Sequence, residues 1–215
     1  MDESTSKEKI LKKIRKALIH KSEVDFGSVD FDSDIYTRSE EAPEILFAQR
    51  FTALNGNFAF CENEKDLITT LSSLVKENNW ENVFCLDAAL KEILTKGKIS
   101  FSDKEQDFKN TNVGVTACEY LVARTGSVMM TSKQASGRRL PAYANYHIVV
   151  AYTNQLVNDV KDALKGIKNK YGNNIPSSIT AITGPSRTAD IEKTLVQGAH
   201  GPKEIYVILV DSTGN

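Results

Sequence analysis

Short apolar runs alternate with amphipathic stretches along the chain from residue 57 to its end. Each apolar run is long enough for a buried strand, and each amphipathic stretch predicts a helix that covers the resulting sheet. This alternation indicates an α/β fold with a mainly parallel sheet flanked by helices. The strands are predicted at 58–61, 82–86, 99–101, 113–116, 127–130, 147–151, 179–182 and 205–210, and the helices at 63–75, 87–97, 156–164 and 189–195.

The segment between residues 113 and 130 departs from this alternation. Only a short predicted helical piece, which turns through Gly126, separates its two strands. Parallel strands need a longer crossover than this spacing allows. An antiparallel insertion or a mixed sheet therefore fits this part of the chain.

The first quarter of the chain predicts an N-terminal helical arm, over residues 1–56, ahead of an α/β domain over 57–215. Apolar residues at helical spacing predict an amphipathic helix over 7–20, with basic residues on its other face. An acidic stretch over 25–34 suits turns, and Pro43 fits the first turn of a second helix. The pattern leaves open whether the arm packs on this domain or on another subunit.

Composition narrows the classes of function. Lys plus Arg total 27 and Asp plus Glu total 28, so the formal charge is -1. This balance argues against a nucleic-acid binder, which usually carries a strongly basic surface. The sequence contains no apolar run long enough to span a membrane and no apolar signal segment near Met1. We therefore expect a cytoplasmic protein.

Three cysteines, Cys61, Cys85 and Cys118, lie far apart within apolar segments. This spacing predicts small core residues rather than a disulfide framework or metal thiolates. Among the histidines, His147 opens an apolar strand and is expected to be structural, whereas His20 follows a basic helix. We expect no metal site in this chain.

The segment after the predicted strand at 179–182 is the first candidate for chemistry. A turn at Gly184 leads to a predicted helix that Ser186 or Thr188 caps, with Asp190 in its first turns. The backbone N–H groups at a helix start and the guanidinium of Arg187 together suit a phosphate or carboxylate. The alternative is an ordinary helix cap with a solvated arginine.

Two further loops carry polar and glycine residues. Thr125 and Ser127 flank Gly126, where freed backbone amides can face a ligand, although a tight turn that needs a positive φ explains the same glycine. His200 lies between glycines in the loop at 196–202. Its near-neutral titration makes His200 the best general acid–base candidate in the chain.

The polar, basic segment at 131–141 offers a fourth candidate. It contains Lys133, Arg138 and Arg139, which a mobile flap can deliver to an anionic ligand. A solvated loop explains the same composition. No paired carboxylates, Ser–His–acid order or dinucleotide-binding glycine motif stands out in the sequence.

Taken together, these motifs resemble those of the LUD family, the lactate utilization protein C group. The resemblance rests on the runs at 183–192, 198–202 and 207–211, and on 124–127 and 140–150 in the same order and spacing. It covers roughly residues 57–215. It implies a fold like that of the NagB/RpiA/CoA-transferase group. The family commonly has an acidic residue where this chain has Arg124.

The resemblance also implies a function. The family is associated with oxidation of L-lactate to pyruvate by a three-protein system whose other members carry iron–sulfur motifs. We therefore expect an accessory or substrate-handling subunit that binds a small anionic ligand, with no cofactor in this chain and iron–sulfur clusters in partner proteins. The alternatives are a stand-alone enzyme acting on a phosphorylated or CoA-linked small molecule, and a structural interaction subunit.

Overall fold

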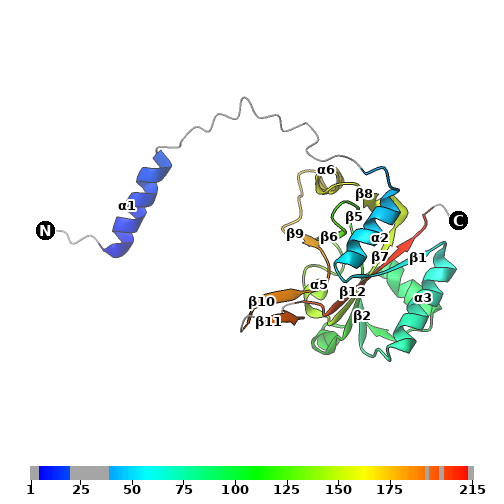
Figure 1. Ribbon diagram of the computed structural model, residues 1–215. Helices are drawn as coiled ribbons and strands as arrows, with labels where there is room; N and C mark the ends of the chain where they lie inside the picture. The colour runs from blue at the N-terminus through cyan, green and yellow to red at the C-terminus, as the bar shows by residue number, and fades with distance from the viewer. Residues whose placement is uncertain (1–4, 20–38, 192–193, 199–200, 213–215) are drawn as a thin grey trace. The chain divides into compact units, whose positions relative to one another are not determined.

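The computed structural model describes residues 5–19, 39–191, 194–198 and 201–212 (Figure 1). The chain divides into two compact units, Met1–Thr37 and Arg38–Asn215. The first unit contains α1 (Ser6–Ile19). The helices of the second unit are α2 (Pro43–Ala53), α3 (Glu64–Glu77), α4 (Ala88–Lys96), α5 (Leu140–Tyr143) and α6 (Val160–Tyr171), with 3-10 turns at Glu105–Asn110 and Thr153–Gln155.

A six-stranded parallel sheet forms the centre of the second unit, in the order β1-β12-β7-β4-β2-β3. This arrangement confirms the predicted α/β fold with a mainly parallel sheet flanked by helices. The apolar runs form strands because burial on both faces favours continuous apolar sequence. These strands are β1 (Asn57–Cys61), β2 (Val83–Cys85), β3 (Phe101–Ser102), β4 (Val113–Ala117), β7 (Tyr146–Tyr152) and β12 (Glu204–Val210).

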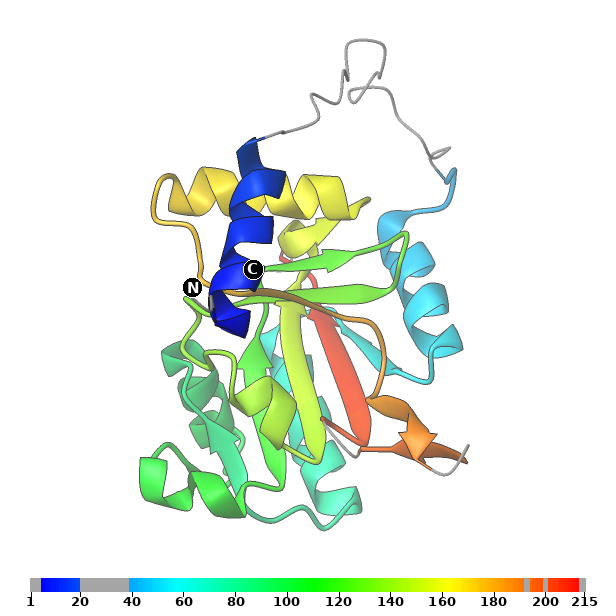
Figure 2. The ribbon, with the colours of Figure 1, turned by 90° about the vertical axis from the view of Figure 1, so that its left-hand side faces the viewer.

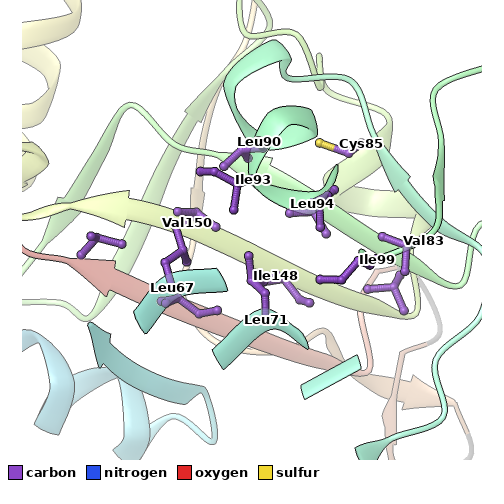
Figure 3. Packing of buried hydrophobic residues seen from close by; sticks show 14 of the residues in the cluster. Leu67, Leu71, Val83, Cys85, Leu90, Ile93, Leu94, Ile99, Ile148 and Val150 are labelled. Atoms are coloured by element: carbon purple, nitrogen blue, oxygen red, sulfur yellow. The ribbon is translucent and has the colours of Figure 1, made fainter. Parts of the chain in front are cut away.

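One face of this sheet packs against α3 and α4. The two helices begin where predicted, because Asn63 and Asp87 accept hydrogen bonds from the backbone N–H groups of their first turns. Their apolar stripes then meet the sheet in a single cluster (Figure 3). The residues labelled in that view are Leu67, Leu71, Val83, Cys85, Leu90, Ile93, Leu94, Ile99, Ile148 and Val150.

The other face is covered by α2 and by a second sheet, in the order β8-β5-β6-β9. Phe47 and Phe51 of α2 are fully buried there, together with Val149 and Val207 of the parallel sheet. Helix α6 packs on the outer side of the second sheet (Figure 2). Its strands are β5 (Tyr120–Val122), β6 (Ser127–Thr131), β8 (Leu156–Val157) and β9 (Ile179–Ile182).

The second sheet confirms the antiparallel insertion and corrects the helical piece expected near Gly126. Strands β5 and β6 pair directly as an antiparallel hairpin, so a turn occupies the place of that helix. The helix expected over 156–164 begins later, at Val160, because residues 156–157 pair with β5 as β8. Pairing with an available sheet edge overrides the helical spacing of these apolar residues.

Helix α2 packs within the second unit, although the sequence places it in an arm that ends at residue 56. Its burial follows from its two phenylalanines, which stack on each other with ring centroids 5.4 Å apart. Within the first unit, α1 has no buried residue. The acidic stretch at 25–34 and His20 lie outside the described residues. None of the helices in the described ranges is long and apolar enough to cross a membrane.

Candidate functional site

A cavity of about 350 Å³ brings together three of the segments that the sequence singles out. The second sheet supplies its floor, the 131–141 segment and α5 supply one side, and the segments at 183–186 and 201–202 supply another. The cavity lies at the amino ends of β7 and β12, and not outside the carboxyl ends of the parallel sheet. The lining residues are Met130, Thr131, Gly137, Arg138, Pro141, Ala142, Thr180, Ala181, Ile182, Thr183, Gly184, Ser186, Gly201 and Pro202.

Backbone hydrogen bonds hold the segments beyond β9 together. The N–H of Ser186 donates to the carbonyl of Pro202 over 2.9 Å, and the N–H of Gly198 donates to the carbonyl of Ser186 over 3.0 Å. A Cβ atom at Gly201 would lie 3.0 Å from the Cβ of Ser186, so the two loop segments approach each other closely. This close approach places Ser186 and Gly201 side by side on the cavity wall.

The turn at 125–127 contacts this region but does not line the cavity. The Ser127 hydroxyl donates to Thr125 Oγ1 over 2.8 Å and lies 2.8 Å from Thr183 Oγ1. Gly126 has a φ of +60°, and a Cβ atom there would lie 2.6 Å from the backbone N of Phe51. Gly126 therefore makes the turn and admits α2, and both side-chain hydroxyls already have protein partners.

Gly184 and Arg187 hold the end of α2. Gly184 is buried with a φ of +88°, and a Cβ atom there would lie 2.8 Å from the carbonyl oxygen of Leu54. The Arg187 Nη2 donates to that same oxygen over 2.9 Å. Since helix ends leave carbonyls without intrahelical partners, this bond satisfies one of them. Arg187 is not among the residues that line the cavity.

The helix predicted over 189–195 is wrong. The chain there forms an antiparallel hairpin of β10 (Arg187–Ile191) and β11 (Thr194–Gln197), with an irregularity in register between Thr188 and Ile191 (Figure 2). Threonine, isoleucine and valine are frequent in this segment, and β-branched residues favour strands over helices. The helix start that was expected to bind an anion is therefore absent, and Thr188 and Asp190 are described by their backbone alone.

The 131–141 segment shows which of its cations faces the cavity. Lys133 Nζ donates to Asn174 Oδ1 over 2.9 Å, and Arg139 pairs with Glu105 over 2.8 Å. Arg138 is exposed and lines the cavity, and it has no ion-pair or hydrogen-bond partner among the described residues. Arg138 is therefore the cation available to a ligand there. His200, the predicted acid–base residue, lies outside the described residues.

Thr180 is a lining residue that the sequence analysis missed. On β9 it shares a side with Ile182, because Thr180 and Ile182 pair with Met130 and Val128 of β6. Two-residue alternation on the predicted strand would have placed Thr180 and Ile182 on one face. The alternation marks the face of the strand but not the cavity, which forms only when β9 packs beside the 131–141 segment.

Comparison with known proteins places this chain in a family. The sequence profile of the LUD domain matches residues 46–210, which is most of the chain. The chain belongs to the LUD domain family. The match confirms the resemblance, and it begins inside α2, which agrees with the packing of α2 on this LUD domain.

Among curated relatives, lactate utilization protein C 1 from Bacillus mycoides is 32% identical over 165 residues, covering 69% of this chain and 70% of that protein. Lactate utilization protein C from Bacillus subtilis is 34% identical over 119 residues, covering 54% of this chain and 48% of that protein. The uncharacterized protein NMB1437 from Neisseria meningitidis is 33% identical over 107 residues, covering 50% of this chain and 46% of that protein. The match therefore spans about half the length of the last two relatives.

The fold also matches a solved structure, that of a DUF162 family protein from Deinococcus radiodurans. The TM-score is 0.57 at 16% sequence identity, and the match covers 78% of this chain and 96% of the other. At this identity the likeness supports the fold alone. It agrees with the mainly parallel sheet of this LUD domain.

Arg124, where the family commonly has an acidic residue, makes an ion pair in this LUD domain. Its Nε donates to Asp159 Oδ2, and Asp159 in turn accepts from the Lys161 N–H at the start of α6. The bond to Arg124 holds the pKa of Asp159 below its ordinary value. Arg124 therefore joins the β5–β6 turn to α6.

A buried carboxylate lies on the outer side of the second sheet. Glu119 accepts hydrogen bonds from Thr131, Lys170 and Tyr171 at 2.6 to 2.8 Å. Burial alone would raise the pKa of Glu119, but these hydrogen bonds together hold it below its ordinary value. The carboxylate anchors α6 to β6, behind the cavity floor.

The remaining titratable groups of the core are structural. His147 is fully buried, with Nε2 2.8 Å from Thr116 Oγ1, which confirms the structural role expected for it. Cys61, Cys85 and Cys118 are buried and unbonded to one another, as predicted, and burial raises the pKa of each thiol. Protonated thiols are poor nucleophiles and metal ligands. The described residues contain no group of three acidic, histidine or cysteine side chains placed to hold a metal ion.

A second cavity, of about 560 Å³, lies at the amino ends of β2, β3 and β4. Its wall includes the carboxylates Glu81 and Asp107 and contains no lysine or arginine. An anion would meet negative charge there without a compensating cation. The cavity beside Arg138 is therefore the better candidate for an anionic ligand.

Proposed function

We propose that this chain is an accessory or substrate-handling component of a bacterial L-lactate oxidation system, and that it binds an organic anion in the cavity beside Arg138. The similarity to lactate utilization protein C 1 over 165 residues carries this proposal. That protein's name states a role in lactate utilization. The proposal extends the same role to this chain.

The cavity supplies the chemistry for anion binding. Arg138 offers a guanidinium that has no partner among the described residues, and its planar array of N–H donors suits a carboxylate or a phosphate. Ser186 and Thr180 also line the cavity and add hydroxyl groups to it. Gly184 and Gly201 allow Leu54 and Ser186 to pack closely behind this part of the wall. The proton shuttle expected of His200 stays a prediction.

Electron transfer belongs to partner proteins in this proposal. An iron–sulfur cluster usually needs four thiolates, and the sequence has three cysteines, all of them in the core. We therefore assign the iron–sulfur clusters to partners and no cofactor to this chain. Its contribution is to bind and orient an anionic ligand for those partners.

The decisive experiment deletes the gene in its source bacterium and measures growth on L-lactate as the only carbon source. We expect growth to fail and to return when the wild-type chain is supplied. Anaerobic purification of a tagged chain should co-purify iron-containing proteins. Normal growth of the deletion strain, or a pure chain that turns over a phosphorylated or CoA-linked compound by itself, would contradict the proposal and favour a stand-alone enzyme.

A further inference from the structure

The cavity beside Arg138 is too large for lactate alone. Lactate has six non-hydrogen atoms. Even if each occupied the ~30 Å³ of a molecule of liquid water, which is an upper limit for covalently bonded atoms, they would fill no more than ~180 Å³. The cavity measures about 350 Å³. This volume falls in the range of sites that enclose drug-sized organic ligands. A three-carbon acid would leave roughly half of the space to water.

The wall of the cavity is mostly apolar. Met130 and Ile182 line it from the second sheet, and Pro141, Ala142 and Pro202 line it from the other sides. Replacing the water at such a wall by an apolar group lowers the free energy of the system. The ligand that fits this wall therefore has an apolar body as well as an anionic group.

Among the described residues that line the cavity, one side chain is charged. Among the fourteen lining residues Arg138 is the only cation, and no carboxylate lies among them. The other polar side chains among these residues are the hydroxyls of Thr131, Thr180, Thr183 and Ser186, and that of Thr131 already donates to Glu119. A single cation beside an apolar wall suits one acidic group on an otherwise apolar molecule, and it does not suit a ligand with several charges.

We infer that this cavity takes an amphiphilic organic anion, with its acidic group at Arg138 and a ring system or branched carbon body against Met130, Ile182 and Pro141. This inference rests on the assignment of the cavity as the ligand site under the proposed function. If the inference is correct, the ligand of this cavity is larger than lactate, and lactate itself binds to another protein of the system.

The test uses 2-naphthoate, L-lactate and the uncharged 2-naphthamide as probes of the full-length chain, with binding measured by isothermal titration calorimetry. We expect 2-naphthoate to bind at least tenfold more tightly than L-lactate. Arg138→Gln should weaken 2-naphthoate about tenfold or more, because a charge-assisted hydrogen bond is lost. The same variant should leave 2-naphthamide unchanged.

Arg139→Gln is the matched control, since Arg139 is the neighbouring arginine and its guanidinium pairs with Glu105 outside the cavity. It should bind both naphthyl probes as the wild type does. Ala142→Phe should weaken both probes, because a ring at this exposed position of the rim fills the cavity without disturbing the core. Circular dichroism of each variant checks that it is folded.

The inference is overturned if the wild type does not bind 2-naphthoate, if L-lactate binds as tightly, or if the two arginine variants lose affinity equally. These outcomes are separate from the growth test. Naphthoate binding by a chain that lactate growth does not require would overturn the proposed function alone. A chain required for lactate growth that ignores naphthoate and binds lactate would overturn this inference alone.

Discussion

The two sheets of the Arg38–Asn215 unit pack on each other but differ in the exposure of their strands. In β7 of the parallel sheet the five central residues are buried, so the strand reaches solvent only at its ends. In β9, at the edge of the second sheet, three of four residues are exposed. The fully buried strand contributes to stability, whereas the edge strand leaves side chains such as Thr180 for a ligand.

Replacing the same residue type in each sheet tests this division. Ile148→Ala in β7 removes a fully buried side chain from the cluster between the sheet and α3, so we expect a loss of about 2–5 kcal/mol in the free energy of unfolding. Ile179→Ala in β9 changes a side chain that is 36% exposed and should cost less than about 1 kcal/mol. Urea denaturation measures both. Equal losses would show that the edge strand carries as much stability as the core.

Acid should weaken the parallel sheet through His147. Burial lowers the pKa of this histidine from 6.5 to about 4 in the folded state, so the unfolded chain takes up the proton first as the pH falls. The stability that neutral His147 contributes is complete above pH 6.5 and is lost progressively toward pH 4, to a total of about 3 kcal/mol. Urea denaturation across this range measures the loss.

A His147→Gln variant provides the control for the pH series, since glutamine does not titrate. Its free energy of unfolding should vary less between pH 6.5 and pH 4 than that of the wild type, whatever its stability at neutral pH. An unchanged pH dependence in this variant would assign the acid sensitivity to other groups. Protonation of Glu119 also lowers the free energy of unfolding as the pH falls, because its pKa is lower in the folded state than its ordinary value of 4.5. This loss occurs mainly below pH 4.5, so the loss in the upper part of the range reports on His147.

Glu119 stabilises the second sheet through polar contacts, because its carboxylate joins β6 to α6. Glu119→Gln at neutral pH keeps the shape of the side chain but weakens three hydrogen bonds to a carboxylate, so we expect a loss of about 1–3 kcal/mol. Glu105→Gln, which breaks an exposed pair with Arg139, should cost less than about 1 kcal/mol. Thermal unfolding of the two variants compares them, and a larger loss in the Glu105 variant would contradict the role given to Glu119.

The parallel sheet could be predicted from the sequence because its signals are local. Continuous apolar runs mark strands that are covered on both faces, and Asn63 and Asp87 mark the helix starts by their own side-chain hydrogen bonds. The β10–β11 hairpin could not be predicted in the same way. Caps and an acidic residue near Arg187 favour a helix locally, whereas the pairing of Thr188 with Val196 forms only when the chain folds back on itself.

The candidate site shows the same limit. Gly184, Ser186 and Gly201 reach the cavity wall, as the clustering of glycines and hydroxyls after a strand indicates. Which arginine binds a ligand could not be predicted from the sequence, because the pairing of each arginine depends on residues far along the chain. Arg124 pairs with Asp159, and Arg139 pairs with Glu105. The folded chain shows that Arg138 lines the cavity and is unpaired among the residues that the structure describes.

Arg187 and Arg138 give the finest test of the comparison between stability and binding. Arg187→Ala removes a hydrogen bond to the carbonyl of Leu54 at the end of α2, and it should lower the free energy of unfolding by about 0.5–1.5 kcal/mol. It should leave the affinity for 2-naphthoate unchanged, because Arg187 does not line the cavity. Arg138→Gln should do the reverse. If Arg187→Ala weakens anion binding as strongly as Arg138→Gln does, the β9–β10 segment reorganises around the ligand, and the separation between a supporting and a binding arginine fails.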